Sequence, residues 1–234
     1  MENETGKIRD KISVLFWCFV VFSVLGMITE MVYCYITTGV IESRQGLVWG
    51  PFCPIYGVGA VVAIILLDRV KESIAKLFFY GAIVGGIVEY ILSYVLESMY
   101  GTRFWDYSYT TYNLNGRICF LYSVFWGILA VVIIRKIYPI FNNILGKIHE
   151  KFNKRIFETI IFIFLIIDSI CTVWAVSAYK TRVKNIYYNK SHKETIFYQM
   201  GQKLFPNEYT LKVFPNIRFI NDDGEEIYIR NIIK

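Results

Sequence analysis

Apolar residues in this 234-residue chain fall into long blocks that are separated by short polar stretches. A block of about 20 apolar residues lets a helix cross roughly 30 Å of hydrocarbon, at a rise of about 1.5 Å per residue. The pattern predicts five membrane spans, at about residues 12–38, 52–67, 77–96, 118–134 and 159–178. The first block is too long for a signal-peptide core, and we interpret it as a retained helix. We therefore expect an all-α polytopic membrane protein whose membrane domain covers residues 12–178.

Three segments outside the spans have patterns of their own. Residues 1–11 form a short amino-terminal segment. Residues 141–158 place apolar side chains on one helical face and Lys or Arg on the rest, which predicts an amphipathic helix that lies on lipid or docks a partner. Residues 179–234 form a soluble tail, where alternation in 209–214 and 217–230 around an Asp-Asp-Gly-Glu turn predicts a β-hairpin.

Lys and Arg residues concentrate before the first span and in the connections that follow the second and fourth spans. The opposite connections contain only Arg44, Arg103 and Arg117. The positive-inside rule therefore predicts a multi-pass protein of the cell membrane with a cytoplasmic amino terminus. The basic residues at 180, 182 and 184 oppose this arrangement, because five spans place the tail outside. If the fifth span is wrong, the tail is cytoplasmic.

Composition excludes several classes of chemistry. Hydrophobic residues make up 55% of the chain and there are two histidines, His149 and His192, both outside the predicted spans. This argues against a His-based zinc site or a histidine-activated nucleophile in the membrane, and we expect no metal, no cofactor and no nucleic-acid partner. The sequence has no GxxxxGK[ST] motif, so it is not itself a P-loop nucleotide hydrolase.

Five cysteines are not a secreted disulfide framework. Cys53 and Cys119 could pair, but free thiols are favoured.

The connection after the first span, RQGLVWGPFCPIYGVG at residues 44–59, contains one charge, two prolines and four glycines. Irregular backbone at membrane depth is tolerated only where protein buries it or where it lines a cavity. Glycines permit close packing of the backbone, and Pro51 and Pro54 stiffen it. The stretch predicts a re-entrant lip that folds back into the mouth of the helix bundle.

Two acidic residues lie inside the predicted spans at one depth. Glu30 lies eight residues before Thr38 and Glu89 lies eight residues before Glu97, which places both about 12 Å below the outer ends of their helices. Arg44, Arg103 and Arg117 are candidate counter-charges. The two carboxylates are interpreted either as a functional site or as ion-pair locks that fix helix register. Asp168 in the fifth span has no nearby cation in the sequence, and it is interpreted either as a functional residue or as a protonated group that makes a helix-packing hydrogen bond.

The second outer connection, residues 101–117, is rich in aromatic residues. One interpretation is a belt of aromatic side chains at the membrane interface. The other is a ligand site, because Asp106, Asn113, Asn115 and Arg117 supply orienting polar groups among the rings.

Several short motifs occur in one order along the chain: the glutamate of the first span, GLVWGPFCPIYGVGA, the EY pair of the third span, WDYS and NLNGRICF. Together they resemble the CmpB-like membrane protein family, whose members are labelled type IV ABC-transporter permeases. The resemblance covers roughly residues 14–140 and implies a membrane location and a permease-like role. The matching positions are Glu30, Arg44, Gly46, Gly50, Pro51, Cys53, Pro54, Tyr56, Gly57, Glu89, Trp105, Asp106, Tyr107, Asn113, Gly116 and Arg117.

Three functions remain open from these observations. The first is a permease-like component of a transporter, with a polar site at the outer mouth. The residues of that site are Glu30, Glu89, Arg44, Asp106, Arg117 and Asn113. A separate cytoplasmic ATPase would then supply energy, and five spans are few enough to imply a homo-oligomer. The second is an intramembrane enzyme for a lipid substrate, although we expect no enzymatic activity because histidine and metal ligands are missing. The third is a structural or regulatory membrane subunit.

Overall fold

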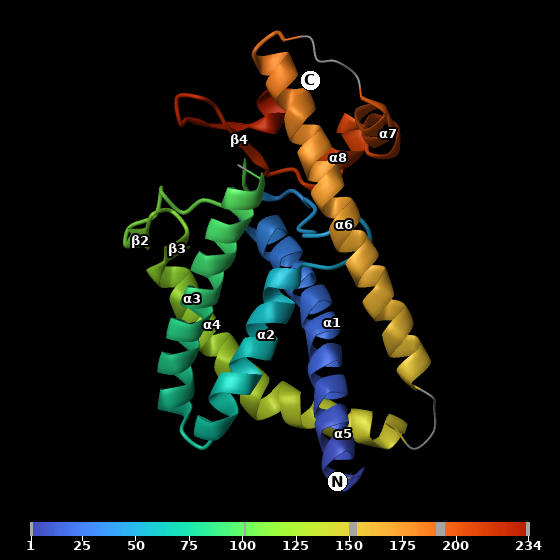
Figure 1. Cartoon of the computed structure of the whole chain (residues 1–234). Coiled ribbons are helices and arrows are strands. Elements are labelled where there is room, and N and C mark those ends of the chain that lie inside the picture. The colour runs from blue at the N-terminus through green and yellow to red at the C-terminus, as the bar shows by residue number, and fades with distance from the viewer. Residues whose placement is uncertain (1, 101, 150–153, 191–194, 233–234) are drawn as a thin grey trace.

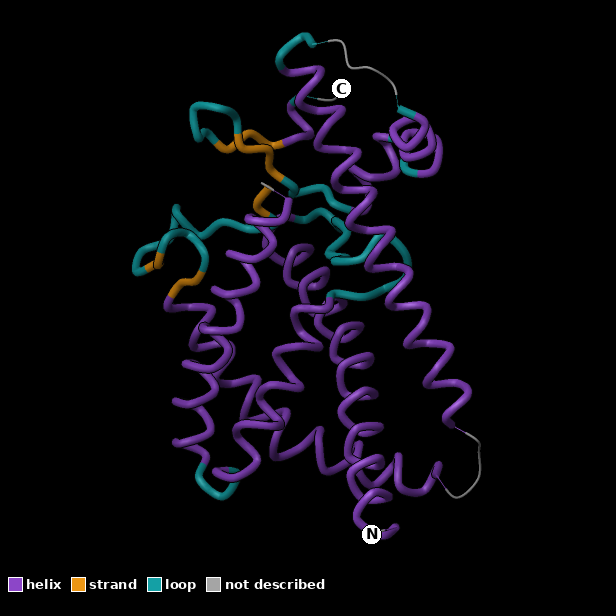
Figure 2. The backbone as a smooth tube through the Cα atoms, viewed as in Figure 1, coloured by secondary structure: helices purple, strands orange, loops and turns teal. Residues whose placement is uncertain are grey.

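The computed structural model describes residues 2–100, 102–149, 154–190 and 195–232. Long helices dominate it, which confirms the all-α fold class (Figures 1 and 2). The helices of the bundle are α1 (Glu2–Thr38), α2 (Pro54–Leu67), α3 (Ile74–Tyr100), α4 (Phe120–Val132), α5 (Tyr138–His149) and α6 (Lys154–Tyr187). A short 3₁₀ turn (Asp68–Val70) follows α2, and a π-helical turn (Ile133–Ile137) joins α4 to α5.

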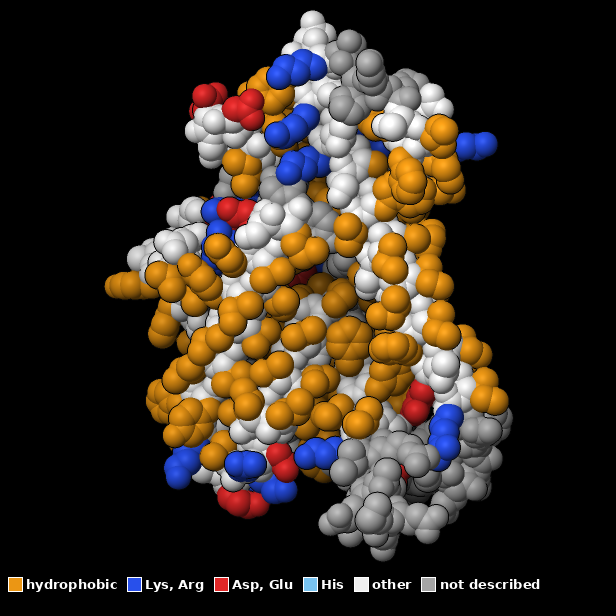
Figure 3. Space-filling model, viewed as in Figure 1, with side chains coloured by type: hydrophobic (Ala, Val, Ile, Leu, Met, Phe, Trp, Pro, Cys, Tyr) orange, Lys and Arg blue, Asp and Glu red, His pale blue; other side chains and the backbone are white. Residues whose placement is uncertain are grey.

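Four helical stretches within the described residues are long and apolar enough to cross a membrane. They are Asp10–Thr38, Ile74–Met99, Phe120–Ile144 and Arg155–Tyr187. Figure 3 shows apolar side chains covering the middle of the molecule, with charged side chains gathered toward its two ends. The chain is therefore a multi-pass membrane protein. The fourteen residues of α2 cover only about 21 Å, so the predicted second span crosses part of the bundle.

Glycines allow neighbouring helices to approach closely, as the polar stripes of the sequence predict. A Cβ atom on Gly81 of α3 would collide with Ala130 of α4, and one on Gly127 of α4 would lie 2.8 Å from the Phe78 carbonyl oxygen of α3. Below this contact, apolar side chains of α1, α2, α3 and the π-helical turn form the main core. Its fully or nearly fully buried members are Cys18, Ala60, Ile64, Leu67, Leu77 and Ile134.

The connection between α1 and α2, residues 39–53 and called the lip below, enters the bundle. The Cys53 N–H donates to the Ser23 carbonyl oxygen at 2.9 Å, roughly 22 Å below the end of α1 at Thr38. The Val48 N–H donates to Thr172 Oγ1 of α6 at 2.8 Å, and Val48 itself is buried. The predicted re-entrant lip is thus present, and protein side chains satisfy its backbone as the membrane environment requires.

The tail and the second outer connection together cover the end of the bundle that carries the lip. They contain β1 (Thr102–Arg103), β2 (Asn113–Leu114), β3 (Ile118–Cys119), α7 (Ile196–Leu204), α8 (Asn207–Val213), β4 (Arg218–Ile220), β5 (Glu226–Tyr228) and a terminal 3₁₀ turn (Ile229–Asn231). Strand β1 pairs antiparallel with β4, and β4 pairs antiparallel with β5. The tail therefore lies on the same side as the second outer connection and opposite the amino terminus (Figure 1).

This placement accounts for the basic residues that follow the last span. Arg182 donates to Asn207 Oδ1 at 2.6 Å and to the Phe205 carbonyl oxygen at 2.7 Å, which fixes the α7–α8 turn against α6. Lys184 lies 4.0 Å from Asp222 of the β4–β5 turn. These basic side chains contact the tail. Their position on the side opposite the amino terminus, which the positive-inside rule does not favour, is therefore explained by contacts within the protein.

Two predictions outside the spans need correction. Strands β4 and β5 confirm the hairpin within 217–230, but residues 209–214 lie in and after α8 rather than in a strand. Thr210, Val213 and Phe214 are all buried, and their spacing of three and four residues is a helical face. The predicted amphipathic helix over 141–158 is also not one helix. Its first part belongs to α5, residues 150–153 lie outside the described residues, and 154–158 begin α6.

Candidate polar site

Glu30 of α1 meets a tyrosine from the first turn of α2. Tyr56 Oη donates to Glu30 Oε1 at 2.6 Å. The lip sets the height of Tyr56, because Pro54 starts α2 directly after Cys53 has bonded to α1. Gly26 of α1 lies against the Tyr56 ring, where any Cβ atom would collide with it. The conformation of the lip and one missing side chain therefore bring the phenol to the carboxylate.

Glu89 of α3 is 4% exposed, and both of its oxygens accept hydrogen bonds. Tyr107 Oη, from the second outer connection, donates to Oε1 at 2.8 Å, and Trp126 Nε1, from α4, donates to Oε2 at 3.0 Å. Gly85 makes room for the Trp126 ring, because a Cβ atom there would lie 2.5 Å from the Trp126 side chain. Burial, followed by the charge of Glu89, raises the pKa of Tyr107 well above its usual value, so this phenol remains a neutral donor.

The two carboxylates belong to one connected cluster, called the carboxylate cluster below and made of Glu30, Tyr56, Trp126, Glu89 and Tyr107. The rings of Tyr56 and Trp126 stack with centroids 5.7 Å apart and 29° between planes. The hydrogen bonds seen at either carboxylate among the described residues come from neutral O–H and N–H groups. Buried carboxylates without a paired cation favour taking up a proton or binding a cation.

Arg44, expected as a counter-charge for the glutamates, has other partners. Its Nη2 atom donates to Cys34 Sγ at 3.0 Å and lies 3.5 Å from Glu42 Oε2. Arg44 therefore joins the lip to the outer end of α1, and its charge acts on Glu30 from a distance.

Arg117 and Asp106 belong to a second group of charges, called the outer ion cluster and made of Glu97, Arg103, Asp106, Arg117 and Arg218. Arg117 Nη1 and Arg103 Nε lie 2.9 Å and 2.6 Å from Glu97 Oε2. Arg218 Nη1 lies 2.8 Å from Asp106 Oδ2. Burial raises the pKa of Asp106, but hydrogen bonds from Ser108 and the Arg218 guanidinium outweigh it, so this pKa lies below its usual value. The cluster joins α3, the second outer connection and the tail.

Asn113 and several motif residues shape the second outer connection. Asn113 Nδ2 donates to the Thr110 carbonyl oxygen at 2.8 Å, and Asn113 Oδ1 accepts from the Gly116 N–H at 3.0 Å. Gly116 has φ +66°, in the left-handed region that glycine adopts readily. Trp105 Nε1 donates to the Arg117 carbonyl oxygen at 3.1 Å. These contacts fix the loop from which Tyr107 reaches Glu89.

Residues of the motif GLVWGPFCPIYGVGA shape the lip and the start of α2. Gly50 has φ +71°, and Gly46 packs where a Cβ atom would lie 2.8 Å from Pro54 Cδ. These residues and Pro51 shape the lip, while Gly57 fits against Ser23 and Phe19 of α1. Asp168 also serves the lip, since its Oδ1 accepts the Trp49 N–H at 2.9 Å.

Sequence reasoning did not identify Trp126 or Arg218 as site residues. A Trp inside an apolar span is a signal for the first, because a buried indole N–H needs an acceptor. Arg218 lies more than a hundred residues from Asp106, and no local pattern links them. The five cysteines are free, so Cys53 and Cys119 do not pair. Within the described ranges, no group of three or more His, Cys, Asp or Glu side chains is placed to hold a metal ion.

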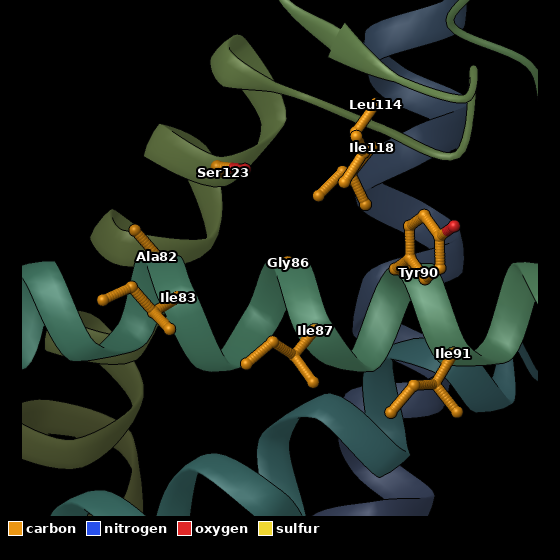
Figure 4. A pocket seen from close by; sticks show the side chains of 9 residues that line it. All are labelled: Ala82, Ile83, Gly86, Ile87, Tyr90, Ile91, Leu114, Ile118 and Ser123. Atoms are coloured by element: carbon orange, nitrogen blue, oxygen red, sulfur yellow. The ribbon is translucent and has the colours of Figure 1, made fainter.

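A groove on the surface of α3 lies outside both the carboxylate cluster and the outer ion cluster. It has a volume of about 410 Å³ and follows the lipid-facing side of α3 beneath the β2–β3 connection (Figure 4). Figure 4 shows Ile83, Ile87 and Ile91 along α3 and Leu114 and Ile118 above them. Its lining is almost wholly apolar, so the carboxylate cluster remains the candidate site.

Comparison with known protein families gives one match. The family model described as "Putative ABC-transporter type IV" matches residues 17–173. This range includes α2, α3, α4, the lip and both carboxylates, and excludes the tail. Searches among curated proteins and among solved structures gave no match.

Proposed function

Because the chain belongs to this ABC-transporter type IV family, we propose that it is a permease-like component of a transporter in the cell membrane, with the carboxylate cluster as its polar site. One observation supports this most strongly. Glu30 and Glu89 come from different helices, are joined by the Tyr56–Trp126 stack, and receive their hydrogen bonds from neutral donors. Structural carboxylates at such depth are expected to have a paired cation.

The proposed site suits a cation or a transported proton. Two carboxylates joined through one aromatic stack in a medium of low dielectric constant repel each other and attract positive charge more strongly than they would in water. Tyr107 covers Glu89 from the lip side, so movement of the second outer connection would expose the carboxylate. Tyr107 is thus the proposed gate on that side.

The orientation and the partners follow from the same proposal. The amino terminus is cytoplasmic, and the lip and the tail lie outside. A separate ATPase docks on the cytoplasmic face, where the α2–α3 connection and α5 are available, since this sequence has no P-loop. Four membrane-long helices are few for a complete pathway, so a second copy of the chain completes it. We further propose that the chain is not itself an enzyme.

A structural subunit is the second candidate, and it has its own supporting observation. The Glu30–Tyr56 bond joins α1 to α2, and the Glu89–Trp126 bond joins α3 to α4. Bonds of this kind across helix pairs would also suit a lock that holds the bundle together.

Proton flux into proteoliposomes separates the two functions. Wild-type protein, Glu30→Gln and Glu89→Gln would be reconstituted with the pH dye pyranine inside the vesicles and a potassium diffusion potential across them. We expect wild-type vesicles to change internal pH faster than empty vesicles, and both Gln variants to lose this flux while melting near the wild-type temperature. Glu208→Gln, on the exposed surface of α8, is the matched control and keeps the flux. Unfolded Gln variants would instead favour the structural lock.

A further inference from the structure

Helix α7 presents a large apolar face that the rest of the described chain leaves uncovered. Ile196, Phe197, Met200 and Leu204 are 75%, 73%, 50% and 53% exposed. At 100° per residue these four positions fall within an arc of about 100°. Gln202 and Tyr198 point to the opposite side of the wheel. A nine-residue helix on a water-exposed surface would normally turn such a face inward.

The position of α7 along α6 shows what lies next to this face. A Cβ atom on Gly201 would lie 3.1 Å from Ala178 Cβ, and the Phe197 ring contacts the Trp174 ring edge-on with centroids 5.7 Å apart. α7 therefore lies beside the 174–178 stretch of α6.

The lipid-facing apolar residues of α6 end at this same level. Ile170 and Val173 are its last exposed large apolar residues before the polar positions Ser177 and Lys180. In Figure 3, apolar side chains gather on the underside of α7 and continue into those that cover α6. The uncovered face is thus continuous with the surface that the membrane-spanning helices present to lipid.

Tryptophans mark this level as well. Trp174 is half-buried between α6 and α7, and Trp49 of the lip is partly exposed and contacts Phe205 at the end of α7. Tryptophan is enriched where the hydrocarbon of a bilayer meets its headgroups. Lys203 lies at the edge of the apolar arc, where its stem can follow the apolar surface and its ammonium can reach a lipid phosphate.

We propose that α7 is an interfacial helix, with its apolar face inserted at the headgroup–acyl boundary of the leaflet on the lip side. Its partner is the lipid of the bilayer that the bundle spans. This inference is independent of the transport proposal.

The same contacts give α7 a consequence for the lip. Tyr209 of α8 donates to the Val48 carbonyl oxygen at 2.9 Å, and Phe205 between α7 and α8 lies against Trp49. A helix that rests on lipid would therefore hold the outer part of the lip through two contacts.

Photocrosslinking in a bilayer tests the proposal on the full chain. The substitutions Phe197→p-benzoylphenylalanine and Met200→p-benzoylphenylalanine probe the apolar face, and Gln202→p-benzoylphenylalanine, on the polar face of the same helix, is the matched control. Each protein would be irradiated in nanodiscs of phosphatidylcholine and phosphatidylglycerol, and adducts would be identified by mass spectrometry. Positions 197 and 200 are largely exposed, and either one alone can carry the test if the other variant folds poorly.

We expect phospholipid adducts at positions 197 and 200 and no phospholipid adducts at position 202. Adducts with a second copy of the chain at positions 197 and 200 would overturn the proposal, because the face would then be a protein interface. Equal lipid labelling at all three positions, or no lipid labelling at 197 and 200, would overturn it too.

Discussion

Two glutamates on one helix, Glu89 and Glu97, are held in opposite ways. They are eight residues apart on α3, or about 12 Å along its axis. Glu97 is paired with two arginines from the second outer connection, Arg103 and Arg117. Glu89 accepts its hydrogen bonds from the neutral groups of Tyr107 and Trp126.

The difference separates two uses of a carboxylate in this helix. A carboxylate with two guanidinium partners keeps its charge, and removal of one partner leaves that charge only partly compensated. A carboxylate with neutral donors keeps its hydrogen bonds whether it is charged, protonated or beside a bound cation. The outer ion cluster therefore joins three parts of the structure, and the proposed transport role requires the carboxylate cluster to change its charge.

Arg117→Met removes one of the two arginines that pair with Glu97 and should have the largest effect on stability. Arg117 is 8% exposed, and the substitution removes its ion pair with Glu97, its hydrogen bond to Ser93 and its contact with the Tyr94 ring. We expect the free energy of unfolding to fall by about 3 kcal/mol, because an ion pair, a hydrogen bond and a ring contact of one nearly buried guanidinium are lost together. Unfolding of the detergent-solubilised protein by heat or SDS measures this.

The double variant Arg117→Met with Glu97→Gln is the control for that experiment. It should recover part of the loss, because the carboxylate charge is removed together with its partner. If the double variant loses more free energy of unfolding than the two single variants lose together, charge compensation is not what Arg117 supplies.

Trp126→Phe removes one of the two neutral donors to Glu89, and we expect a smaller effect on stability. The phenyl ring keeps the stack against Tyr56, but Glu89 Oε2 loses its N–H donor. We expect a loss of about 1.5 kcal/mol in the free energy of unfolding. Trp105→Phe is the matched control, since that indole donates to a backbone carbonyl oxygen, and we expect about 1 kcal/mol there. An unchanged Trp126→Phe protein would mean that the indole N–H bond to Glu89 does not contribute to stability.

The sequence predicts positions along the chain better than partners. Four of the five predicted spans correspond to membrane-long helices among the described residues, because burial in lipid demands that length, whereas α2 is too short to cross alone. The Gly-Pro stretch indicates the lip because few other residues permit that backbone. The common depth of Glu30 and Glu89 follows from helical rise. The hydrogen-bond donors do not follow, because Arg44 and Arg103 are nearer in sequence to Glu30 and Glu89 than Tyr56 and Tyr107 are. Only the folded loops decide which side chain reaches each carboxylate.

The tail shows the same limit at longer range. The pairing of Phe219 with Thr102, and of Arg218 with Asp106, joins segments that no local pattern relates. In α8, the alternation of apolar and polar residues suggested a strand. The burial of Thr210, Val213 and Phe214 against α6 decides in favour of a helix, since tertiary packing overrides a short period-two pattern.

Acid pH tests the outer ion cluster through Asp106. The pKa of Asp106 is depressed in the folded protein, so its contribution to stability is complete above the unfolded-state pKa, about 3.9, and is lost as pH falls through the lower folded value. We expect the contribution to be about 1 kcal/mol, because the pair with Arg218 is close to the surface. Melting temperatures of wild type and Asp106→Asn from pH 6 to pH 3 should converge at the acid end. Parallel curves would exclude Asp106 as the group responsible.

The smallest effect is expected at the carboxylate cluster itself. Glu89→Gln keeps an oxygen for Trp126 Nε1, and its amide N–H₂ can donate to Tyr107 Oη, because a hydroxyl accepts as well as donates. We expect the free energy of unfolding to change by less than about 1 kcal/mol. Glu97→Gln, on the same helix, removes the charge that two arginines share and should lose about 2 kcal/mol or more.

The ratio of these two Gln effects decides whether the comparison holds. Both substitutions replace a carboxyl group of α3 with an amide of nearly the same shape. The two sites differ in their partners and in exposure, since Glu89 is 4% exposed and the Glu97 side chain is 22% exposed. If Glu89→Gln destabilises the bundle as much as Glu97→Gln, the carboxyl group of Glu89 is structural and the carboxylate cluster is a lock. If Glu89→Gln is tolerated, stability does not require a carboxyl group at this buried position, which leaves it a role in the chemistry of the site.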